Sequence, residues 1–130
     1  MIENKIIQIT KEEATKIEID SKNEEDLFIV TLDMMNVQTW EQFAEVLGDA
    51  FNLPMRNECP DGTRDWMQDL DWLNKEAYAI ILLNYSKLHN LSFKNLLIKF
   101  FTGLTQWWEK DVTQFCVDGK AKPFNVYLVE

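Results

Sequence analysis

Three short apolar runs divide this chain, and segments with helical periodicity separate them. The runs cover residues 27–32, 78–83 and 124–129, and their length and composition are typical of buried strands. Between the first two runs, Phe43, Val46 and Leu47 recur at helical spacing. Strands that alternate with helices are joined by crossover connections. The sequence therefore predicts an α/β fold with a small, largely parallel sheet.

Two of the helices have recognisable boundaries. Thr39 and Gln42 fit a capping box, and Pro54 forbids continuation, so the first of these helices should end near residue 51 or 52. Ser92 is expected to open a long helix that carries the Trp107-Trp108 pair and buries most of its aromatic residues. Within it, Gly103 predicts a place where the helix packs closely against a neighbour.

The first 26 residues read as an N-terminal extension to a domain that covers residues 27–130. Apolar and polar residues alternate over residues 6–9 and again over 16–19, which predicts two edge strands or a hairpin. A chain of 130 residues has the size of a single domain, so these strands are expected to belong to the same core or its edge.

Composition limits the partners that the chain can bind. Lys and Arg number 13 against 22 Asp and Glu, for a net charge of −9. This charge repels nucleic acids and anionic membranes and attracts basic proteins. Cys59 and Cys116 are isolated, with no metal-ligand spacing, and we expect reduced thiols and neither metal nor cofactor. The first residues show no secretory signal pattern, so a cytoplasmic location is expected.

The segment at residues 61–73, DGTRDWMQDLDWL, concentrates aspartates. A helix is expected within it, capped by Asp61 or Thr63. At 3.6 residues per turn its apolar side chains face one way and its polar ones the other. The apolar face comprises Trp66, Leu70 and Leu73 with Met67 at its border, and the polar face comprises Asp61, Asp65, Gln68 and Asp69. Early aspartates suit the helix dipole, but Asp69 and Asp71 oppose it, which indicates a binding site or merely a solvated face.

Residues 51–54, FNLP, and the segment 61–73 together resemble the signature of the barstar family of ribonuclease inhibitors. In that family a phenylalanine-and-proline turn ends the first helix, and an aspartate-bearing second helix follows. The resemblance extends from about residue 27 to residue 129. It implies a three-stranded parallel sheet covered by helices, to which an extra N-terminal strand pair could be added here.

The resemblance also implies a function. The second helix would plug the basic active site of a ribonuclease or nuclease-type toxin, with Asp61 and Asp65 on the two aspartates that the family inserts. The expected partner-binding residues are Asp61, Arg64, Asp65, Gln68, Asp69, Trp72 and Glu109. Such an immunity protein would be no enzyme, would need no cofactor and would be a monomer when free. Residues 55–60 lack the family's aromatic contacts, and Arg64 adds a positive charge, so the partner is expected to differ from the family's best-known one.

Two other functions remain open at this point. The same fold could serve as a non-catalytic adaptor or regulatory domain for a protein that is not a nuclease. Alternatively, Asp65, Asp69 and Asp71 could form a carboxylate cluster for Mg²⁺ or Ca²⁺ in an enzyme. Trp72 could anchor an interface or pack inward.

Overall fold

The computed structural model describes residues 2–56 and 59–130 of the chain. In chain order the elements are β1 (Ile6–Ile9), α1 (Lys11–Ser21), β2 (Leu27–Asp33), α2 (Trp40–Phe51), α3 (Pro60–Met67), β3 (Ala77–Leu83), the 3-10 turn η1 (Tyr85–Lys87), α4 (Leu91–Gln106), the π-helical turn η2 (Trp107–Asp111), α5 (Val112–Phe115) and β4 (Phe124–Val129). The strands form one parallel sheet in the order β1-β4-β3-β2. The α/β class and the parallel sheet are confirmed; among the described residues the three expected strands are joined by one N-terminal strand and not by a strand pair.

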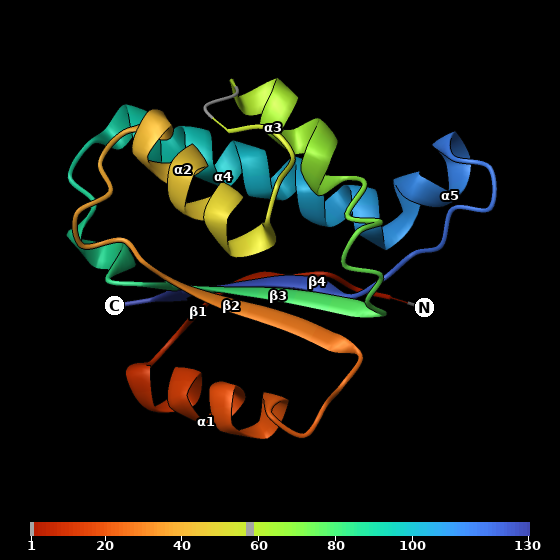
Figure 1. Ribbon diagram of the computed structural model, residues 1–130. Helices are drawn as coiled ribbons and strands as arrows, with labels where there is room; N and C mark the ends of the chain where they lie inside the picture. Colours follow the sequence, from red (N-terminus) through yellow and green to blue (C-terminus); the bar gives the residue numbers. More distant parts are fainter. Residues whose placement is uncertain (1, 57–58) are drawn as a thin grey trace.

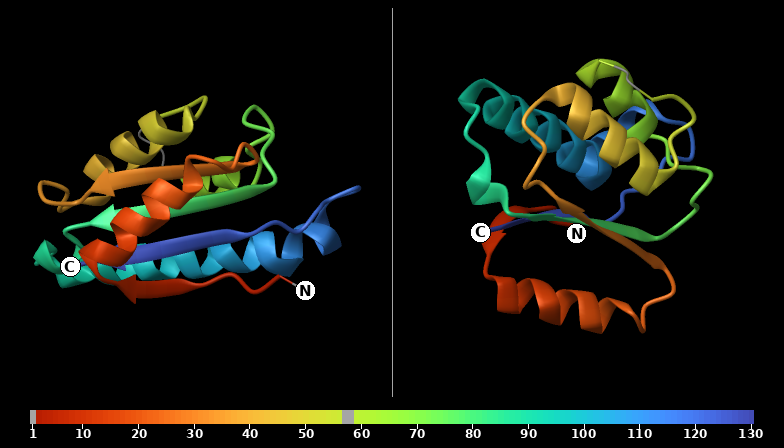
Figure 2. Two further views of the ribbon diagram at one scale, coloured as in Figure 1. Left: turned by 90° about the horizontal axis from the view of Figure 1, so that it is seen from below. Right: turned by 60° about the vertical axis from the view of Figure 1, so that its left-hand side comes forward.

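Helices cover both faces of the sheet, but unequally. Helices α2, α3 and α4 lie over one face, and α1 crosses the other (Figure 1; Figure 2). Alternate residues of β3 pack on opposite faces of the sheet, with Ile80 in the larger core and Ile81 in the smaller one. The larger core is aromatic: Phe43 of α2 packs edge-to-face on Phe101 of α4. The larger layer therefore holds most of the apolar area that stabilises the fold.

The N-terminal part differs from the sequence-based expectation. Residues 6–9 do form an edge strand, which pairs in parallel with β4, but residues 16–19 lie in α1 and not in a second strand. The Thr10 hydroxyl accepts from the Glu13 backbone N–H, and the Glu13 carboxylate accepts from the Thr10 N–H, each at 3.1 Å. This capping box starts a helix that turns Ile17 toward the sheet and leaves Ile19 exposed.

The two helices with recognisable boundaries lie close to where they were predicted. The Thr39 side chain caps α2, and Asn52 ends it in the left-handed region, with φ of 52°. Helix α4 begins one residue before Ser92, because the side chain of Asn90 accepts from the backbone N–H of Phe93 at 3.1 Å. Within residues 2–56 and 59–130, neither α4 nor any other helix combines the length and apolar character needed to cross a membrane.

The aspartate-rich segment is helical over only part of its length. Helix α3 ends at Met67, and Leu70 adopts a φ of 56°, a left-handed conformation that stops the helix. Its N-cap position is Cys59, which makes no side-chain cap bond, so the expected capping by Asp61 or Thr63 is wrong. Asp69, Asp71 and Trp72 therefore lie in turns beyond α3 and not on its polar face.

Candidate functional site

A groove of about 460 Å³ lies beside the C-terminal end of α3, and we call it the acidic groove. Its walls come from the end of α3 and the turn after it, from η2 and α5, and from the loop that leads to β4. The charged side chains that line it are Asp65, Asp69, Asp71, Asp118, Lys120 and Lys122. The groove thus joins three aspartates of the predicted segment to a fourth from a distant turn.

The two lysines of the acidic groove are engaged elsewhere. Lys120 forms an ion pair with Glu76, and this hydrogen bond holds the pKa of the Glu76 carboxyl below its usual value. The Lys122 ammonium donates to the Lys75 carbonyl at 2.6 Å and lies 5.7 Å from the ring centroid of Trp108. Neither lysine forms an ion pair with an aspartate of the groove.

Asp65 is exposed on α3 and faces the acidic groove. Its carboxylate makes no hydrogen bond or ion pair with any residue that the structure describes. Asp61, one turn earlier, instead accepts from Arg64 Nη2 at 3.0 Å. Both residues of this pair line a separate hollow of about 240 Å³ between α3 and α4. The expected row of carboxylates is therefore divided: Asp65 and Asp69 share the groove, and Asp61 and Arg64 lie outside it.

Asp69 and Asp71 form a like-charged pair in the turn after α3. The Asp69 carboxylate accepts from the backbone N–H of Asp71 at 3.3 Å. Partial burial raises the pKa of Asp69; the hydrogen bond from the Asp71 N–H opposes this rise, and the Asp71 carboxylate adds to it. A raised carboxyl pKa marks a place where negative charge is disfavoured, and a cation from a partner would relieve it.

Two indoles from the far end of the long helix hold the end of α3. Trp107 Nε1 donates to the Gln68 carbonyl at 3.1 Å, and Trp108 Nε1 donates to the Met67 carbonyl at 2.9 Å. Trp108 is buried, as expected for a core residue, whereas Trp107 is half-buried and stacks on the exposed ring of Phe115. Trp107 and Gln68 both line the acidic groove, so its floor is tied to α3 by these bonds.

Two further residues predicted to bind the partner have contacts within the chain. Trp72 packs inward: its Nε1 donates to the Phe51 carbonyl at 2.8 Å, and its ring lies against Trp66. Glu109 Oε1 accepts from the backbone N–H of Asn4 at 2.8 Å, which fastens the start of the chain beside η2. Neither residue lines the acidic groove.

Asp118 is a groove residue that the sequence did not single out as a binding residue. Asp118-Gly119 was expected only as a turn, and Asp118 does adopt a φ of 59°. Among the described residues, no group of three or more His, Cys, Asp or Glu side chains is placed to hold a metal ion, and this includes Asp65, Asp69 and Asp71. Cys59 and Cys116 are free, exposed thiols.

Neither a scan against models of known protein families nor a search of curated proteins finds a match to this chain. The resemblance to the barstar family therefore depends on the residues of the segments 51–54 and 61–73 and stays a prediction. Residues 57 and 58, which fall in the departure from that family at residues 55–60, lie outside the described residues.

Proposed function

We propose that this protein inhibits a basic ribonuclease or a nuclease-type toxin, as an immunity protein does, by placing the carboxylates of the acidic groove in the nuclease active site. The observation that carries the proposal is that Asp65, Asp69 and Asp71 converge on one groove without a cationic partner among the described residues. Carboxylates placed in this way are suited to a surface that supplies several cations.

The active site of a nuclease is such a surface. It binds phosphate groups through Arg and Lys side chains, and carboxylates can occupy the same positions as phosphate oxygens. The net charge of −9 would attract a basic enzyme from a distance and speed association. A bound arginine would also offset the repulsion between Asp69 and Asp71, which adds to the effect of burial on the pKa of Asp69.

Rigidity of the groove supports tight binding. The Trp107 and Trp108 indoles fix the carbonyls that end α3, and Asp65 precedes these carbonyls by less than one helical turn. A surface that is already ordered loses less conformational entropy when it binds. The backbone beside Asp65 would therefore lose little conformational entropy on binding, and only the Asp65 side chain would still have to be ordered.

The test is inhibition of a panel of purified basic ribonucleases, with residual activity measured against inhibitor concentration at low and moderate salt. We expect at least one enzyme to be inhibited stoichiometrically, with slower association as salt rises. Asp65→Ala should weaken this inhibition by about 2 kcal/mol or more, because it leaves a cation of the enzyme buried and unpaired.

The matched control is Asp20→Ala, which removes an exposed aspartate from α1 on the other side of the sheet. This variant should inhibit like the unmodified protein. The proposal fails if every ribonuclease in the panel stays fully active, or if the Asp65 and Asp20 variants inhibit equally.

A second function, an adaptor for a basic protein that is not a nuclease, would use the same carboxylates together with exposed apolar side chains at and near the groove. Phe115 is 74% exposed and Val117 is 96% exposed. Exposed apolar side chains of this kind add contact area to any protein interface. An adaptor would bind its basic partner through Asp65 and leave all nucleases active.

A further inference from the structure

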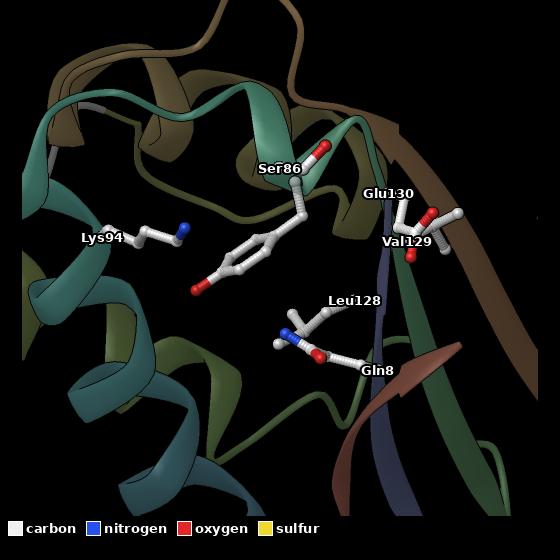
Figure 3. A pocket seen from close by; sticks show the side chains of 7 residues that line it. Gln8, Ser86, Lys94, Leu128, Val129 and Glu130 are labelled. Carbon is white, nitrogen blue, oxygen red and sulfur yellow. The ribbon is translucent and has the colours of Figure 1, made fainter. Parts of the chain in front are cut away.

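A second hollow, of about 400 Å³, lies at the opposite end of the sheet, and we call it the carboxyl-edge hollow. The acidic groove is lined by Lys122, just before β4 begins, whereas the carboxyl-edge hollow is lined by Val129 and Glu130, where β4 ends. Its lining residues are Gln8, Tyr85, Ser86, Lys94, Leu128, Val129 and Glu130 (Figure 3).

The hollow lies at the carboxyl ends of the strands, which is where parallel sheets of this topology usually bind ligands. Strand β1 leads into α1 on one face, and β3 leads through η1 into α4 on the other (Figure 1). The end of β4 lies between these two strands. In open parallel sheets, ligands bind outside the carboxyl ends of the strands where successive connections leave toward opposite faces.

Tyr85 carries a polar group that the fold leaves without a partner. The residue is only 7% exposed and lines the hollow, yet its hydroxyl makes no hydrogen bond to any residue within the ranges 2–56 and 59–130. Among the described residues, no buried side-chain nitrogen or oxygen lacks a hydrogen-bond partner, so the Tyr85 hydroxyl is open to the hollow and an acceptor on a ligand can reach it. Burial raises the pKa of Tyr85 above its ordinary value, and the protonated hydroxyl can donate a hydrogen bond.

Opposite charges face this hollow from separate elements. Lys94 of α4 lies 4.8 Å from the ring centroid of Tyr85 and forms no ion pair within the described part of the chain. Glu130 is exposed at the end of β4 and likewise has no cationic partner there. Lys94 lies on one side of the hollow, and Gln8, Val129 and Glu130 lie on the other (Figure 3).

We propose that the carboxyl-edge hollow binds a small zwitterion of the free α-amino acid class, with its carboxylate toward Lys94 and the Tyr85 hydroxyl and its ammonium toward Glu130. A simple anion would meet the Glu130 carboxylate and the net charge of −9, and a simple cation would meet Lys94. A zwitterion offers a carboxylate to Lys94 and an ammonium group to Glu130. The volume of about 400 Å³ falls within the range usual for small-molecule sites.

The experiment is an NMR titration of the ¹⁵N-labelled protein with each standard free L-amino acid up to about 10 mM, which detects millimolar affinities. We expect at least one of them to shift the amide signals of Gln8, Ser86 and Val129 saturably. For that amino acid, the N-acetylated and the C-amidated forms should each bind at least about tenfold more weakly, since each lacks one of the two charges.

Variants locate the site. Tyr85→Phe keeps the ring and should weaken binding several-fold, and Lys94→Gln should weaken it about tenfold by loss of a charge-assisted hydrogen bond. Lys99→Gln changes a lysine of the same helix that lines a different hollow, and it should leave the affinity unchanged. Thermal unfolding of each variant checks that it is folded.

Three results would overturn the proposal: no amino acid gives saturable shifts, the N-acetylated form binds as tightly as the zwitterion, or Lys99→Gln weakens binding as much as Lys94→Gln. Because this hollow and the acidic groove share no lining residue, failure here leaves the proposed inhibition of a nuclease untouched.

Discussion

The indole N–H of Trp108 donates a hydrogen bond to the carbonyl oxygen of Met67 at 2.9 Å. The last carbonyls of an α-helix have no partner within the helix, and both of these residues are buried from water. A side chain that is 41 residues away along the sequence therefore completes the end of α3. This bond links the long helix directly to the wall of the acidic groove.

Trp108→Phe should destabilise the protein by about 1–3 kcal/mol, because it leaves a buried carbonyl without a donor. The smaller ring also leaves unfilled space, which adds to the loss. Urea denaturation measures the free energy of unfolding. Trp107→Phe is the matched control: Trp107 and Gln68 are half-buried, so water can replace the lost bond and the loss should be smaller. Equal losses in the two variants would contradict this account.

Alanine substitutions at two glycines, one beside α3 and one in the acidic groove, should have opposite effects on the stability of the protein. A Cβ at Gly103 would lie 3.5 Å from Arg64 Nη1, an ordinary contact, so Gly103→Ala should stabilise the helix by up to about 1 kcal/mol. A Cβ at Gly119 would collide with the backbone carbonyl of Val112, so Gly119→Ala should be clearly destabilising. Thermal unfolding compares the two, and a loss of stability on Gly103→Ala would contradict the packing of Arg64.

The strands of the central sheet were predictable because their sequences are almost continuously apolar. The run predicted at residues 124–129 is β4, and β2 and β3 each extend the predicted run by one residue. Both faces of these strands contact other parts of the chain, so apolar and polar residues alternate only weakly along them. Their content of β-branched residues was enough to predict strands.

Helix α1 was missed because alternation of Ile17 and Ile19 with charged residues imitates a half-buried strand. The capping box of Thr10 and Glu13 was present in the sequence and was the better signal. The two isoleucines have different environments: Ile17 packs against the sheet and Ile19 is 57% exposed. Period-2 alternation over four residues cannot distinguish these two cases.

The acidic groove could be predicted only in part. Asp65, Asp69 and Asp71 are close in sequence, so their concentration was visible as a charge pattern. Asp118 comes from a turn before β4, and only the tertiary fold brings it to the groove. The carbonyls at the end of α3 accept from indole donors about forty residues away, and no local pattern in residues 61–73 encodes these contacts.

Thr10→Ala tests the capping box that starts α1. Loss of the side-chain acceptor for the Glu13 N–H should destabilise the protein by about 0.5–2 kcal/mol, the usual cost of removing an N-cap. Thr10→Ser keeps the hydroxyl acceptor and should change the free energy of unfolding little. Urea denaturation of both variants provides the comparison, and equal losses would show that the cap does not stabilise α1.

Asp69→Asn should change the stability of the protein and its binding to a nuclease in opposite directions. The folded protein holds the Asp69 proton more tightly than the unfolded chain, since burial and then Asp71 raise the pKa above its ordinary 3.8. Ionised Asp69 therefore costs stability at neutral pH, and asparagine removes that cost while keeping an acceptor for the Asp71 N–H. We expect Asp69→Asn to raise the free energy of unfolding at neutral pH. The same substitution removes a carboxylate from the acidic groove, so it should weaken nuclease inhibition. The gain should shrink as pH falls through the raised pKa and vanish below the ordinary value of 3.8, and Asp20→Asn should show no comparable gain. If Asp69→Asn lowered stability at neutral pH, ionised Asp69 would not be what raises the energy of the free groove.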